Sequence, residues 1–239
     1  IDCWWQTDVK GLFAVGEAAA SHGVYRPGGT ALNAGQVGST RAAQYIAARC
    51  RGDASAGFDA AASAALAEMA ALADACRADT GNVRALWQHV AEEMSRCGAA
   101  IRDPAQICAY GKQVEAQLAD FAQTVKAGSR TELAMLYRLR DMLLSQRAYL
   151  TAMTDYTAHG GQSRGSALHT DLTGGVKPFG QLPDTFTFAL DETENPLVQE
   201  LWYEDGVCRT AWRAPRPIPG DDDFFENVWR SYRETGNID

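Results

Sequence analysis

The sequence predicts a mainly α-helical protein, with a strand–loop–helix segment, an antiparallel helical bundle, and a small β-hairpin followed by a last helix. Three observations carry this prediction. Apolar residues recur at helical spacing over residues 58–156. A glycine-rich stretch follows a short apolar run in residues 1–50. Asp205 and Gly206 separate two alternating runs, a strong short-range signal for a hairpin.

Charge and composition argue against several classes of protein. The 239 residues carry a net charge of −8 at pH 7, whereas nucleic-acid binders present a basic face to phosphate. No run of about 18 apolar residues occurs, so no transmembrane segment is predicted. The six cysteines are scattered without a C-x-x-C pair. This favours buried free thiols in a reducing cytoplasm over disulfides or a zinc site.

Residues 1–50 are predicted to hold a strand, a glycine-rich loop and a helix. The apolar run at 12–15 stops at Gly16 and Glu17, as a buried strand followed by a tight turn would. Helical spacing then covers residues 36–49. Glycines let a backbone approach a ligand closely, and a helix start offers free N–H donors. The segment could therefore hold an anion or a carbonyl-bearing ring.

Residues 51–158 are predicted to form the helical bundle, after a small polar linker. Each helix combines an apolar stripe with a start or stop signal. The predicted helices are 58–78, 83–97 with Asn82 as N-cap, 103–127 opened by Asp103 and Pro104, and 131–156 opened by a capping box at Ser129 and Glu132. The last helix is apolar on two faces, so we expect it at the centre of the bundle.

Residues 159–239 are predicted to form a loop, a hairpin and a terminal helix. The predicted elements are a strand at 185–189, hairpin strands at 197–203 and 207–213, and a last helix at 223–234. A two-residue turn at Asp205 and Gly206 would place Trp202 opposite Arg209. A cation–π pair could form between those two side chains.

Two stretches resemble one family of flavoproteins. Residues 11–17 (GLFAVGE) and 22–32 (HGVYRPGGTAL) closely resemble the second flavin-binding segment of the succinate dehydrogenase and fumarate reductase flavoproteins. That family includes L-aspartate oxidase. Residues 162–167 (QSRGSA) resemble the E-S-R-G-A-H segment that follows the family's helical bundle. Tyr25 replaces the family's asparagine and Pro27 follows the arginine, so the substrate need not be a C4 dicarboxylate.

The resemblance implies the C-terminal part of an FAD-dependent oxidoreductase. The family's N-terminal βαβ unit carries a G-x-G-x-x-G motif, which this sequence lacks. We therefore expect the N-terminal FAD-binding half of the same protein as a partner. The parent would transfer a hydride between flavin and a small substrate bearing a carboxylate or carbonyl. Because the βαβ unit holds most of the FAD, this chain alone is expected to bind none tightly.

The resemblance also implies roles for individual residues. Arg26 would clamp a substrate carboxylate with its planar fork, or would only bond loop carbonyls. His22 would orient the substrate, or would pack the loop. Glu17 would accept hydrogen bonds from the flavin ribityl chain, or would be a solvated turn residue. The expected cofactor-binding residues are Gly16, Glu17, Gly28, Gly29, Thr30, Ala31 and Leu32, and no metal site is expected.

Two further alternatives stay open at the level of sequence. Arg164 would position the bundle against the flavin domain or enter the substrate side, or would have only a structural role. The whole chain could also be a non-catalytic helical packing or interaction module that binds no cofactor as an isolated fragment. Whether the purified protein is yellow distinguishes the flavoprotein from this module.

Overall fold

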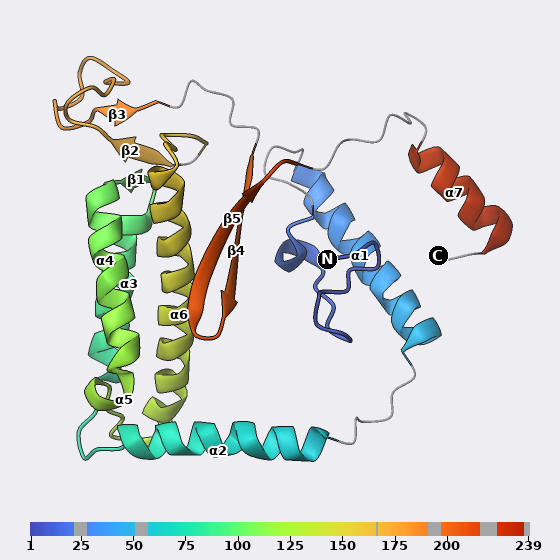
Figure 1. The fold of residues 1–239 in the computed structure, drawn as a ribbon, viewed down its shortest axis with the longest axis horizontal. Coiled ribbons are helices and arrows are strands. Elements are labelled where there is room, and N and C mark those ends of the chain that lie inside the picture. Colours follow the sequence, from blue (N-terminus) through green and yellow to red (C-terminus); the bar gives the residue numbers. More distant parts are fainter. Residues whose placement is uncertain (22–27, 51–56, 166, 191–196, 216–223, 237–239) are drawn as a thin grey trace. The chain divides into compact units, whose positions relative to one another are not determined.

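The computed structural model has the predicted, mainly helical architecture (Figure 1). It describes residues 1–21, 28–50, 57–165, 167–190, 197–215 and 224–236. A three-stranded sheet and a separate two-stranded hairpin accompany the helices. The contacts within the chain group it into two units, Ile1–Ala61 with Ile218–Asp239, and Ala62–Pro217.

The first unit contains the short 3-10 helix η1 (Gly16–Ala19) and the long helix α1 (Gly28–Arg49). The strand predicted at residues 12–15 is wrong, because only a single antiparallel bridge joins Gln6 to Phe13. This run bonds only to the residues just before it among the described part of the chain. Without a longer neighbouring strand, the bridge does not extend into a ladder.

Helix α1 begins at Gly28, well before the start predicted at residue 36. Its glycines serve close packing. A Cβ on Gly38 would lie 2.5 Å from Nε1 of Trp5, and one on Gly35 would lie 3.7 Å from Cα of Gly16. A glycine costs a helix about 1 kcal/mol relative to alanine, but here it lets the N-terminal segment lie against the helix. The glycine-rich residues 28–35 are therefore helical where the sequence predicted a loop.

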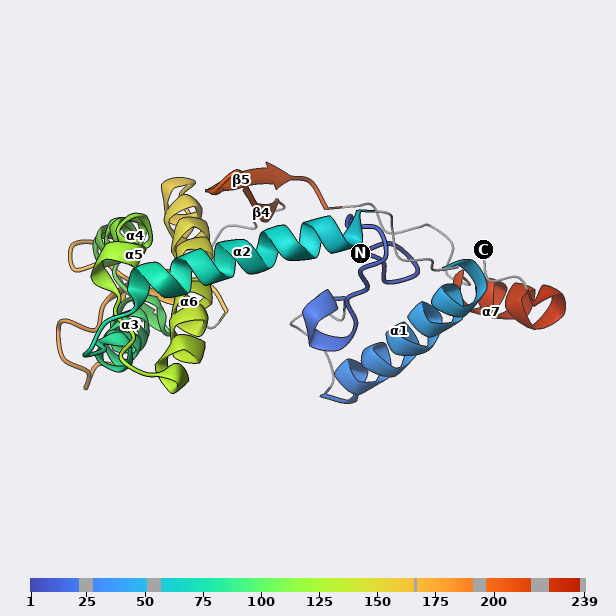
Figure 2. The same ribbon diagram turned by 90° about the horizontal axis from the view of Figure 1, so that it is seen from below.

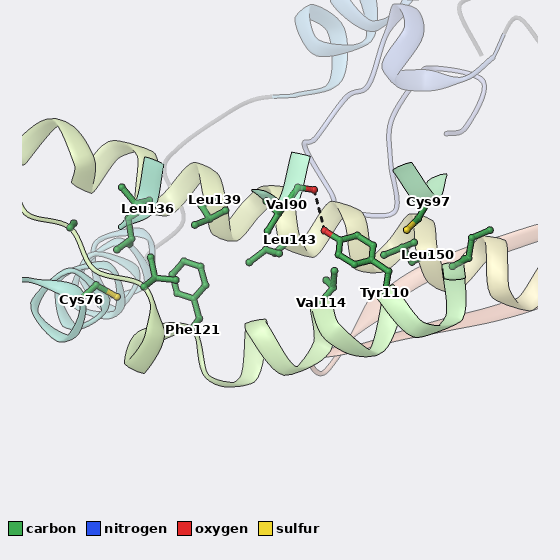
Figure 3. Close-up of a cluster of buried hydrophobic side chains, with 14 residues drawn as sticks. Cys76, Val90, Cys97, Tyr110, Val114, Phe121, Leu136, Leu139, Leu143 and Leu150 are labelled. Atoms are coloured by element: carbon green, nitrogen blue, oxygen red, sulfur yellow. Dashed lines mark hydrogen bonds between the residues drawn. The ribbon is translucent and has the colours of Figure 1, made fainter. Parts of the chain in front are cut away.

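The second unit is built on an up-down-up bundle of α3 (Val83–Gly98), α4 (Pro104–Ala119) and α6 (Arg130–Ala158) (Figure 1). Helix α6 packs against both of the other helices, as its two apolar faces predict. Figure 3 shows the buried core between them. The buried residues of α6 are Leu136, Leu139, Leu143, Gln146 and Leu150.

The core includes a small cluster of polar groups. The Tyr110 hydroxyl lies 2.9 Å from Oε1 of Gln146 and 3.1 Å from the carbonyl of Val90, and the Gln146 amide donates to the same carbonyl. Figure 3 marks the bond between Tyr110 and Val90. Burial raises the pKa of Tyr110 to about 12. The buried oxygens therefore keep hydrogen-bond partners, which a core of this kind requires.

Helix α2 (Phe58–Cys76) lies mostly outside this core (Figure 2). Of its residues only Cys76 is buried, while Leu72 packs partly against the bundle and Leu66 and Met69 are exposed. Its many alanines bury little apolar area, so they give weak packing energy. The prediction that this segment forms a fourth bundle helix is therefore wrong.

The helix predicted at residues 103–127 is correct at its start and wrong at its end. The Asp103 side chain accepts hydrogen bonds from two amides of the first turn, as an N-cap does. Helix α4 ends early, and a single turn, α5 (Phe121–Thr124), follows. Ala127 then forms an isolated bridge with Arg77. The helix therefore ends before this bridge, although the spacing of the apolar side chains predicted that it would continue.

Two other caps differ from their predicted form. The Asn82 side chain bonds the carbonyl of Thr124 and the amide of Lys126, and makes no cap bond to α3. Ser129 accepts from the amide of Glu132 at 3.3 Å, as half of a capping box. The Glu132 carboxylate accepts from the amide just before the cap.

The three-stranded sheet lies at one end of the bundle. It consists of β1 (Ile101–Arg102), β2 (Leu168–Thr170) and β3 (Phe188–Ala189), in that order. Strands β1 and β2 are parallel, and β2 and β3 are antiparallel. The strand predicted at 185–189 is thus reduced to its last two residues, because β2 offers it only a short partner.

The hairpin of β4 (Val198–Glu204) and β5 (Val207–Arg213) confirms the predicted turn and register. Trp202 lies opposite Arg209, which forms an ion pair with Glu204 at 3.6 Å. The cation–π contacts among the described residues do not include the pair of Trp202 and Arg209. The last helix, α7 (Phe224–Thr235), closely matches its predicted bounds.

One carboxylate fastens the hairpin to α6. Oδ2 of Asp155 accepts from Nε2 of Gln199 at 2.7 Å and from Nε1 of Trp212 at 2.8 Å. Burial alone would raise the pKa of Asp155, but the hydrogen bonds it accepts outweigh burial and lower that pKa. The carboxylate is therefore ionised at neutral pH and holds both strands.

Replacing Gly206 with valine is expected to destabilise the hairpin. Asp205 and Gly206 have φ of 51° and 78°, the left-handed pair of a type I′ turn. A β-branched residue in this region costs roughly 1–2 kcal/mol. Amide hydrogen exchange of β4 and β5 should accelerate in Gly206→Val. Gly180→Val is the control, because Gly180 has an ordinary φ and open space around it. Equal protection in both variants would contradict the turn assignment.

Candidate functional site

The predicted cofactor residues lie on two elements of the first unit that contact each other, η1 and α1. Gly16 and Glu17 open η1, and Gly16 has φ of 67°. The remaining residues, 28–32, begin α1. The contact between the elements includes the close approach of Gly35 to Gly16. The fold thus brings the Gly-Glu turn and the glycine-bearing helix into contact.

The first residues of α1 are mostly exposed. Gly28, Gly29 and Thr30 are exposed and Ala31 is half-buried. A Cβ on either glycine would meet nothing within 4 Å. The first four N–H groups of any helix have no partner within the helix, and the dipole of a long helix favours negative charge there. A ligand with carbonyl or anionic oxygens could therefore approach this turn.

Side chains at this site offer one carboxylate and one apolar group. Glu17 is exposed on η1, and Leu32 is 77% exposed on α1. A carboxylate accepts hydrogen bonds from hydroxyls, and the helix start donates to carbonyls. The expectation from sequence assigns these donors and acceptors to the pyrimidine edge and the ribityl hydroxyls of a flavin. The two predicted catalytic residues, His22 and Arg26, lie outside the described residues.

The structure also places Arg164, the weaker candidate from sequence. Its exposed side chain lines a pocket of about 420 Å³ in the second unit, together with Arg102 and His169. Sequence reasoning missed this group because its members are far apart in the chain. The parallel pairing of β1 and β2 sets Arg102 directly beside His169, and no local motif announces such a pairing.

All six cysteines are free thiols. Cys76 and Cys97 are buried, as predicted, and burial raises the pKa of both thiols. Cys3 and Cys50 are exposed, so the prediction of buried thiols is wrong for these two. Across the described ranges, His, Cys, Asp and Glu form no group of three or more that could hold a metal ion.

Comparison of the chain with models of known protein families, with curated proteins and with solved structures finds no match. Every helix within the described ranges is too short or too polar to cross a membrane. The functional assignment therefore rests on the motif residues and on the geometry that surrounds them.

Proposed function

We propose that this chain is the C-terminal portion of an FAD-dependent oxidoreductase similar to fumarate reductase. The observation that carries the proposal is the motif at residues 11–17 and 22–32, in which a Gly-Glu pair precedes an arginine and a Gly-Gly helix start. Two structural features support it. Helix α1 starts at the motif's own glycines, and a Cβ on Gly28 or Gly29 would meet nothing within 4 Å.

Specific residues would hold the cofactor. The backbone N–H groups of Thr30, Ala31 and Leu32 would bind the flavin pyrimidine edge, and Glu17 would accept from the ribityl hydroxyls. Gly28 and Gly29 would let the ring come close to the backbone. FAD, when bound, supplies hydride transfer. The positive end of the α1 dipole would stabilise negative charge at that edge.

Arg26 and His22 would act on the substrate. Arg26 would hold a carboxylate with two parallel N–H donors, and His22 would orient the same molecule. The substrate class is accordingly a small molecule with a carboxylate or a carbonyl beside the reacting carbon. The N-terminal FAD-binding half of the same protein would be the chain's partner. Six free thiols support a reducing, cytoplasmic location for the complete protein.

The proposal is tested by the reoxidation of the complete, reduced protein. Carboxylate-bearing acceptors such as fumarate should restore the oxidised flavin spectrum, and the matching diamide should not, because it lacks the charge that Arg26 recognises. A panel of unsaturated and 2-oxo carboxylates covers the substrate class. Reoxidation by dioxygen alone, with no acceleration by any carboxylate, would contradict the proposed activity.

This chain without its partner is expected to bind no FAD tightly. The segment offers roughly one carboxylate and a few N–H groups, at about 0.5–1.5 kcal/mol net for each hydrogen bond. Association costs about 4 kcal/mol or more. Titration of FAD into the 239-residue chain, followed by flavin fluorescence, should show no saturation at micromolar concentration. Riboflavin serves as the control for weak ring stacking. Stoichiometric FAD binding would overturn this expectation.

One observation favours the second candidate function, a helical packing module. Helix α2 exposes Phe58, Leu66 and Met69, at 61%, 65% and 46%. Apolar side chains exposed along one helix are typical of a surface that another protein segment covers. A complete protein that remains colourless and binds a partner through α2 would favour this module over the oxidoreductase.

A further inference from the structure

The pocket in the second unit lies where four elements meet, at the end of the bundle that carries the sheet. Its lining comes from β1, β2, the C-terminal half of α6 and β4, with the loop that precedes β2. Figure 1 shows β1 and β2 at this end of α6. A volume of about 420 Å³ falls in the range of pockets that bind small molecules.

The lining is positively charged. Among the residues that the structure describes, it includes two arginines, Arg102 and Arg164, and no carboxylate. Arg102 is half-buried, and its Nε donates to the carbonyl of Ala99 at 2.8 Å. Within the described residues neither arginine forms an ion pair with an acidic group. A guanidinium held next to apolar surface without a counterion attracts an anion.

His169 adds an unsatisfied polar group to the same lining. The side chain is 2% exposed, and neither ring nitrogen has a hydrogen-bond partner within the described part of the chain. Its backbone is fixed by Ser163, whose Oγ accepts from the His169 amide at 2.7 Å. Burial, helped by the charge of Arg102, lowers the pKa of His169, so the ring is neutral at pH 7. A buried N–H without an acceptor is costly, and a ligand oxygen would remove that cost.

Apart from Gln162 and Gln199, the rest of the described lining is apolar or aromatic. Tyr149 and Tyr156 contribute rings, and Ala152 and Met153 lie on the same turns of α6. The Tyr156 ring is kept in place by its hydroxyl, which donates to the carbonyl of Gln162 at 2.9 Å, and by the His169 ring at 5.8 Å. Such a wall suits the body of an apolar or aromatic ligand.

We propose that this pocket binds a small organic carboxylate with an apolar or aromatic body. Arg164 and Arg102 bind the carboxylate, His169 donates to it, and the tyrosines contact the body. All of the lining residues named here belong to the second unit, whereas the flavin segment belongs to the first. Inorganic anions match only the charged part of the lining.

The test uses the intact chain labelled with ¹⁵N-histidine and titrated with benzoate. We expect a saturable shift of the His169 ring signals, assigned with His169→Gln. Benzyl alcohol and inorganic phosphate should each bind at least about 10-fold more weakly. Benzyl alcohol lacks the carboxylate that the arginines bind, and phosphate lacks the aromatic body that the tyrosines contact. Absence of a saturable shift, or equal binding of either probe, would overturn the proposal.

Variants identify the residues responsible. Arg164→Gln should weaken benzoate binding by at least about 10-fold, since a charge-assisted bond is lost. The fold should survive, because the Arg164 side chain is exposed. Arg140→Gln, which removes an exposed arginine of α6 outside the pocket, should bind as the unchanged chain does. Arg102→Gln provides a second measurement. Unchanged affinity in both pocket variants would rule out the site.

Discussion

Replacing Leu143 with alanine is expected to lower the free energy of unfolding by about 2–5 kcal/mol. The side chain is 2% exposed and lies on α6, within the core formed with α3 and α4. Removing the γ carbon and its two methyl groups loses their transfer free energy and leaves a cavity between three helices that cannot easily collapse. Leu136→Ala, at a fully buried position of the same helix, should have a similar effect.

Chemical denaturation measures this effect directly. Leu66→Ala makes the same chemical change at a position on α2 that is 65% exposed, so it should alter stability by less than about 0.5 kcal/mol. The contrast between these leucines separates burial in the bundle from a general effect of alanine. A Leu143→Ala protein as stable as Leu66→Ala would show that α6 is not the centre of the core.

Replacing Arg26 with lysine is expected to reduce turnover of the complete protein by roughly 10- to 100-fold. Lysine keeps the positive charge but loses the planar fork that binds both carboxylate oxygens. A hydrogen bond to a charged group is worth about 1.5–3 kcal/mol, and each 1.36 kcal/mol corresponds to about a tenfold change in rate. Flavin content should change far less, because Arg26 is assigned to the substrate and not to the cofactor.

The measurement compares the rate at which a carboxylate acceptor reoxidises the reduced protein with the FAD released per chain. Arg140→Lys is the matched control, since it makes the same change on the exposed side of α6. Wild-type turnover in Arg26→Lys would remove Arg26 from the substrate clamp. Equal losses of turnover and FAD would move it to the cofactor site.

The sequence correctly predicted those elements in which the local sequence pattern agrees with the packing of the folded chain. Helix α6 has two apolar faces and packs on two helices, and the Asp205–Gly206 turn requires positive φ at both residues. The errors occur where contacts between residues far apart in the sequence determine the structure. The end of the 103–127 helix yields to pairing between Ala127 and Arg77. The apolar spacing of α2 indicated a buried helix, but its alanines provide little area to bury.

The two candidate sites also differ in how far they could be predicted from the sequence. The motif at η1 and α1 is contiguous in sequence, so its residues could be named in advance. The helix start at Gly28 was missed, because glycine is a poor helix former. Within the helix, only Gly35 and Gly38 have a packing reason for glycine, since they lie against Gly16 and Trp5. The carboxylate pocket could not be predicted, since Arg102 and His169 meet only through parallel strand pairing.

The flavin content of the complete protein tests the proposed function most directly. The complete reading frame that encodes this chain is expressed and purified without added flavin, and the cofactor is released by acid and quantified. We expect a yellow protein with stoichiometric FAD, and a loss of FAD in Glu17→Ala, which removes the acceptor for the ribityl hydroxyls. A colourless protein that stays colourless after incubation with FAD would contradict the assignment as a flavoprotein.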